Sequence, residues 1–129
     1  TDLRLRVLGI RHDEEISKEG EDVKARLEEW AESGESMEGF VLRYAHLEGI
    51  HLNSPQGRDL RRANLWRAHL QGAHMYNIDL RGAGLLKADL AGANLNEAKM
   101  QDVDLLGADL AGTKLQRVQW GEKAVQERN

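Results

Sequence analysis

Large apolar residues recur at every fifth position through the second half of the chain. They begin at residue 60 and end at residue 120: Leu60, Leu65, Leu70, Met75, Leu80, Leu85, Leu90, Leu95, Met100, Leu105, Leu110, Leu115 and Trp120. A small or β-branched residue precedes most of them by two positions, as in ADLAG at residues 88–92. This repeat is the dominant pattern of the sequence.

A period of five fits neither an α-helix nor a flat strand. On a helix, a step of five residues advances about 500°, so successive leucines would circle the axis. In a flat strand, side chains alternate faces, so an odd step would reverse each leucine. The pattern therefore predicts a β-solenoid in which each repeat turns a corner and directs the same two positions inward.

A second period of twenty residues predicts four repeats per turn. Glycines recur at this spacing at one corner: Gly72, Gly92 and Gly112. Gly49 joins them if residues 53–57 form a three-residue bulge. Because glycine suits a turn that needs positive φ, this column is the candidate for a strained corner, although Gly82 and Gly107 occupy the same repeat position on other sides. Repeats starting at Phe40 then give about four coils.

The first 39 residues follow other patterns. Residues 3–10 alternate apolar and arginine side chains, which predicts a strand. A helix is expected from about residue 17 to 33, with Val23, Leu27, Trp30 and Ala31 on one face and Gly34 at its end. We expect this helix to cap one end of the solenoid. The predicted organisation is residues 1–39 as strand and capping helix, residues 40–120 as solenoid, and residues 121–129 as a tail.

The repeats resemble the pentapeptide-repeat family, which builds right-handed quadrilateral β-helices from A-(D/N)-L-x-x units. The resemblance implies an all-β fold of about four coils, preceded here by a strand and a capping helix. It says little about activity. The best-understood members, the quinolone-resistance proteins, bind DNA gyrase as acidic DNA mimics.

One surface column is unusually apolar. Residues that follow the inward leucine on one side of successive coils are Arg43, Trp66, Leu86 and Leu106. The family usually places polar residues here, and an apolar stripe commonly marks an interface. We expect these residues, with Arg67 at the margin, to contact a protein partner or a second copy of the chain. The alternative is that the terminal tail or the N-terminal strand covers the column.

Trp120 is a second candidate for contact. It occupies an inward position of the last partial coil, where no later coil can cover it. Its ring could plug the end or pack against the same end of a second molecule. The resemblance supports the second interpretation, since family members often dimerise through C-terminal ends.

Charge disfavours a DNA mimic and a nucleic-acid binder. Residues 1–39 carry six basic and twelve acidic side chains, net −6, whereas residues 40–120 carry ten and eight, net +2. A mimic needs a long acidic face, which this short and slightly basic body lacks. A cationic region is expected at Arg61, Arg62 and Arg81, but Asp59 and Asp79 dilute its field. Gyrase modulation remains the alternative function.

No motif points to catalysis, a cofactor or a metal. The chain has no Cys, and its glycines follow the coil corners rather than a phosphate loop. Two histidine pairs should stack on adjacent coils, His46 with His69 and His51 with His74, but no third metal ligand is obvious for either. We therefore predict no metal site.

The sequence as a whole predicts a non-enzymatic interaction or scaffold module. Its partner would be a protein or a second copy, as a homodimer or as a subunit of a larger assembly. No apolar run approaches the ~20 residues of a membrane span, and the absence of Cys is compatible with the cytoplasm, where we expect the protein.

Overall fold

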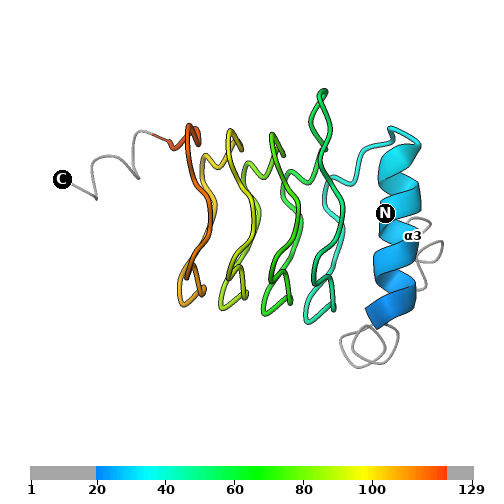
Figure 1. The fold of residues 1–129 in the computed structure, drawn as a ribbon, viewed down its shortest axis with the longest axis horizontal. Helices are drawn as coiled ribbons and strands as arrows, with labels where there is room; N and C mark the ends of the chain where they lie inside the picture. Colours follow the sequence, from blue (N-terminus) through cyan, green and yellow to red (C-terminus); the bar gives the residue numbers. More distant parts are fainter. Residues whose placement is uncertain (1–19, 122–129) are drawn as a thin grey trace.

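The computed structural model describes residues 20–121. One helix, α3 (Gly20–Glu32), is followed by a coil that winds to the end of the described chain. The predicted strand at residues 3–10 and the tail beyond Gly121 lie outside the described residues. Figure 1 shows the coils stacked along one axis, with α3 across one end.

Parallel bridges join each coil to the next and define four sides. One column of bridges runs from Val41 through Asn64 and Gly84 to Asp104. Three further columns begin at His46, His51 and Asp59. Within residues 20–121 the pairing consists of isolated bridges rather than continuous strands, because each repeat turns a corner after a single paired residue.

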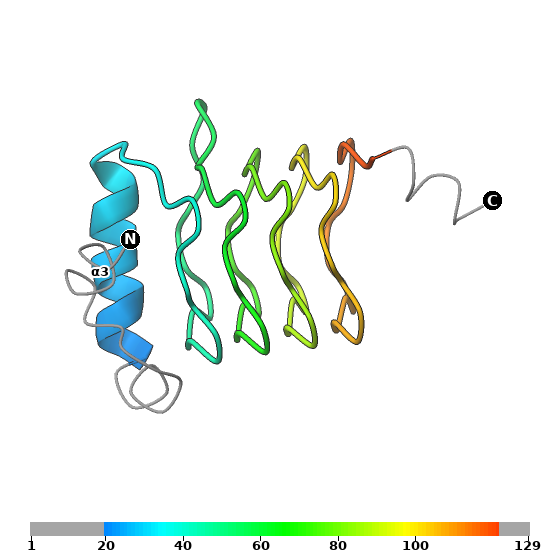
Figure 2. The ribbon, with the colours of Figure 1, turned by 180° about the vertical axis from the view of Figure 1, so that it is seen from behind.

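The register confirms the predicted bulge. Before it, bridged residues are 23 apart, as in His51 with His74, and after it they are 20 apart, as in Asp59 with Asp79. The three additional residues therefore lie between His51 and Asp59. The extra loop projects beyond the corners of the neighbouring coils (Figure 2).

Positive φ occurs at every corner, so the glycine column does not mark a special one. Gly72 and Gly92 have φ of 67° and 70°, but Gly82 on another side has 72°. Arg62 and Lys87 adopt the same conformation, with φ of 58° and 56°. The expectation of a unique strained corner is wrong, because the turn after each inward leucine requires this backbone whatever its residue.

Burial confirms the inward positions. All apolar residues at the two repeat positions from Leu60 to Met100 are 2% exposed or less. In the last coil the same positions are only partly buried, and Leu110 is 36% exposed. The difference arises because each coil buries the one before it, so the last coil of the described chain is covered from one side only.

Helix α3 covers the opposite end, through the face that its sequence predicts. Val23, Leu27 and Ala31 are fully buried and belong to the same core as the coil. Trp30 packs edge-on against Phe40, with ring centroids 5.6 Å apart. The bulge also reaches the helix, since Arg58 Nη1 donates to the Ala31 carbonyl at 2.5 Å. A cation at the last turn complements the negative end of the helix dipole.

Candidate interaction surfaces

The predicted apolar column lies on the side that follows the bridges of Asn64, Gly84 and Asp104. Asparagine and aspartate side chains fix the turn there: Asn64 Oδ1 accepts from the Trp66 amide at 3.2 Å, and Asp104 Oδ1 from the Leu106 amide at 3.1 Å. The column carbonyls accept from the neighbouring coil, as in Lys87 N to Leu106 O at 2.8 Å. Hydrogen bonds within and between coils therefore fix the backbone that carries the side chains of the column.

The Trp66 ring packs against the next coil of the solenoid. It lies over Gly84, where an added Cβ would be only 2.7 Å from Trp66 Nε1. The Arg43 guanidinium lies 5.9 Å from the ring centroid, within range of a cation–π contact. Trp66 still exposes 42% of its surface. The ring is a positioned aromatic group whose remaining area faces solvent.

The other members of the column extend the apolar surface along the axis. Leu86 is partly buried, and Leu106 is 72% exposed, the largest value among the exposed large apolar residues of the described chain. Arg67 is exposed at the corner beside Trp66. The structure therefore brings Arg43, Trp66, Arg67, Leu86 and Leu106 together on one side.

Trp120 belongs to a different surface, the open end of the coil. It is partly buried against the core, with Val103, Leu105, Leu115 and Val118. The backbone of this end is also open: in the preceding coil the amides of Leu85 and Leu90 donate to the next coil, whereas Leu105 and Leu110 have no acceptor among the described residues. Sequence reasoning identified the aromatic ring but not these free donors, which follow from where the repeats end.

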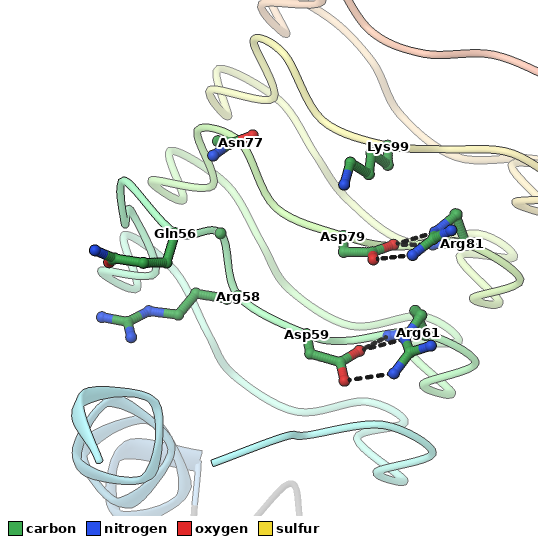
Figure 3. A pocket seen from close by; sticks show the side chains of 9 residues that line it. Gln56, Arg58, Asp59, Arg61, Asn77, Asp79, Arg81 and Lys99 are labelled. Atoms are coloured by element: carbon green, nitrogen blue, oxygen red, sulfur yellow. Dashed lines mark hydrogen bonds and ion pairs between the residues drawn. The ribbon is translucent and has the colours of Figure 1, made fainter. Parts of the chain in front are cut away.

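The expected cationic region is largely neutralised by local ion pairs (Figure 3). Arg61 Nε donates to Asp59 Oδ1 at 2.9 Å, and Arg81 forms the same contact with Asp79 at 2.9 Å. Arg62 pairs with Glu38. The hydrogen bond from Arg61 holds the pKa of the Asp59 carboxyl well below its usual range. This side therefore presents alternating charges rather than a basic patch.

A polar cavity of about 370 Å³ lies between these pairs and the bulge. Burial raises the pKa of Asp79, but hydrogen bonds and charge from Arg81 outweigh it, so the pKa stays below its usual value. Lys99 lines the same hollow (Figure 3). Both aspartates are paired with arginines, so Arg58 and Lys99 leave the lining with a net positive charge.

Both histidine pairs stack as predicted. The rings of His46 and His69 lie 4.3 Å apart and 5° from parallel, and those of His51 and His74 lie 4.6 Å apart and 7° from parallel. The expectation that neither pair has a third ligand is wrong for the first pair, because Glu48 Oε2 lies 3.5 Å from His46 Nδ1. The carboxylate two residues after His46 was the available signal.

No helix within residues 20–121 is both long enough and apolar enough to cross a membrane. The surfaces available on the described part of the chain are the apolar column, the open end, the paired charges and the histidine stacks.

The repeats match a known protein family. The family model described as pentapeptide repeats matches residues 59–96 and 88–119, with 8 copies of the repeat. A search of curated proteins gave no significant match.

Solved structures give a consistent result. Rfr23, a pentapeptide repeat protein from the cyanobacterium Cyanothece 51142, matches with 28% identity over 64% of this chain and 60% of its own, at a TM-score of 0.56. A pentapeptide repeat protein from the thylakoid lumen of Arabidopsis thaliana matches with 30% identity over 66% of this chain and 61% of its own, at a TM-score of 0.53. This chain thus covers less than two thirds of either relative. With its twenty-residue coils and matched repeats, the chain belongs to the pentapeptide-repeat family.

Proposed function

We propose that the chain is a non-enzymatic protein-interaction module whose binding surface is the apolar column of Trp66, Leu86 and Leu106. The observation that carries the proposal is the exposure of Trp66 and Leu106, 42% and 72%, in one column with Leu86 between them, on a solenoid whose other apolar residues are mostly inside. Removing such area from water contributes about 25 cal/mol per Å². A partner that covers the column would gain this energy.

The rigidity of the column supports the same role. Every coil is tied to the next by backbone bonds, and Trp66 is positioned by Gly84 and Arg43. A positioned aromatic side chain loses little conformational entropy on binding, which is why aromatic and arginine residues dominate interface energetics. Arg43 and Arg67 would form the polar margin.

The finer architecture belongs to this proposal as well. Four columns of bridges support a quadrilateral cross-section, and family membership supports a right-handed coil. We propose that the module acts in the cytoplasm, so a cytoplasmic lysate is the source of candidate partners. The paired charges of Asp59 and Asp79 argue against an acidic DNA mimic, so the surface does not favour gyrase modulation.

The test compares the protein with the triple variant W66S/L86S/L106S. Proteins captured from lysate are identified and purified, and the dissociation constant of each is then measured with both forms. We expect the triple variant to bind at least a hundredfold more weakly, since that factor corresponds to about 3 kcal/mol shared among three truncated anchors. Light scattering on both forms detects self-association through the same surface.

The matched control is A91S/A111S, which changes the corresponding positions on the neighbouring side of the coil. The control should bind like the wild type, and circular dichroism should show that all forms are folded. Equal affinity and equal mass for the wild type and the folded triple variant would refute the proposed surface.

A further inference from the structure

His46, Glu48 and His69 form a compact group of ligand atoms on the surface of the first two coils. One donor atom from each residue lies within 4.8 Å of the other two. His46 and His69 stack across the coil boundary, and Glu48 approaches His46 at 3.5 Å. Within residues 20–121, this is the one group of three His, Cys, Asp or Glu residues that meets this criterion.

We propose that this group binds a divalent transition-metal ion of the Zn²⁺ class, which clamps the first coil to the second. Two imidazoles and one carboxylate match the donor set of zinc sites that keep a fourth position for water or another ligand. The site is separate from the apolar column, since His46 and His69 belong to a different column of bridges, on another side of the coil.

The backbone beneath the site is already fixed. His46 and His69 are bridged, His69 N donates to Ala45 O at 2.9 Å, and Leu47 N donates to His69 O at 2.8 Å. Metal binding therefore requires only side-chain movement. Zinc–ligand bonds of about 2.0–2.2 Å in a tetrahedron place ligand atoms about 3.3 Å apart, so the donors must close by up to about 1.5 Å.

Exposure makes that movement feasible. The side chains of His46 and Glu48 are 41% and 49% exposed, so both can rotate without disturbing the core. Without a metal, the same contact is an ion pair whenever His46 is protonated. An exposed ion pair of this kind contributes little to stability. The ion pair alone predicts no response to added Zn²⁺, whereas the metal site predicts saturable binding.

The second histidine pair is an internal control. His51 and His74 stack with nearly the same geometry, but the residue two positions after His51 is Asn53. Its Oδ1 accepts from the Tyr76 amide at 2.8 Å. A neutral amide that is already engaged is a much poorer ligand than the Glu48 carboxylate, so this pair should not bind the metal comparably.

The experiment uses the full chain after removal of any polyhistidine tag. Zn²⁺ is titrated calorimetrically, and Co²⁺ is titrated with visible absorption as a report on coordination geometry. We expect one saturable site, a melting temperature that rises with Zn²⁺ and falls again with EDTA, and tetrahedral cobalt bands. H69N and E48Q should each weaken binding at least tenfold, whereas H74N should bind like the wild type.

Folding of each variant is checked by circular dichroism. The proposal is overturned if the wild type shows no saturable binding at millimolar Zn²⁺. It is equally overturned if H69N and E48Q bind like the wild type, or if H74N weakens binding as much as H69N.

Discussion

Truncation of one inward leucine in two successive coils tests how the solenoid is stabilised. Leu47, Leu70, Leu90 and Leu110 occupy one inward column, twenty residues apart after the bulge, but Leu90 is fully buried and Leu110 is 36% exposed. Leu90→Ala removes three carbons, worth about 0.8 kcal/mol each in transfer free energy, and leaves a cavity that adds about 1.5 kcal/mol. We therefore expect a loss of about 4 kcal/mol.

Leu110→Ala is the matched control, because the chemistry and the repeat position are the same. Part of its side chain is already in water, and no coil within the described residues encloses a cavity around it. The expected loss is about 1 kcal/mol on the same scale. Urea unfolding followed by circular dichroism gives both values, with the m-value showing whether the unfolding unit has changed. Equal losses, or a larger loss at Leu110, would refute the account of coils buried by their successors.

Three further predictions follow from single contacts. Gly57→Ala should destabilise the protein by about 1–3 kcal/mol in thermal melts, because φ is +82° and the new Cβ would lie 2.8 Å from the Asn77 carbonyl oxygen; an unchanged melting temperature would contradict this. The lowered pKa of Asp59 means that its ion pair stabilises the fold above about pH 4, the unfolded value, and that this contribution is lost as pH falls through the folded pKa. Asp59→Asn should therefore cost about 1–2 kcal/mol at pH 7 and progressively less below pH 4, so a cost that does not vary with pH would exclude the pair as its origin. Gly84→Ala should displace the Trp66 ring and change the tryptophan emission while leaving the urea midpoint nearly unchanged, since the ring is partly exposed; emission identical to that of the wild type would show that the ring does not rest on Gly84.

The five-residue repeat was enough to predict most of the fold. A period of five excludes a helix and a flat strand by geometry alone, and the inward side chains of residues 60–100 are buried as that argument requires. The capping face of α3 was also predictable, because Val23, Leu27 and Ala31 follow helical spacing. Both conclusions rest on local periodicity, which a single sequence displays directly.

Features that depend on neighbouring coils were harder to predict. The glycine column suggested one special corner, but Arg62 and Lys87 adopt the same positive φ because the coil geometry imposes it. The Trp66 ring is positioned by Gly84, which lies on the next coil and is bridged to Asn64. Only the structure shows this contact. Glu48 lies beside His46 through side-chain placement, which the stacking argument did not include.

The most direct test of the interaction module is the affinity of its purified partner, or of the chain for itself, for wild type and W66S/L86S/L106S. The proposal predicts a loss of at least a hundredfold in the triple variant and no change in A91S/A111S. Unchanged binding by a folded triple variant would contradict it and would direct attention to the open end at Trp120.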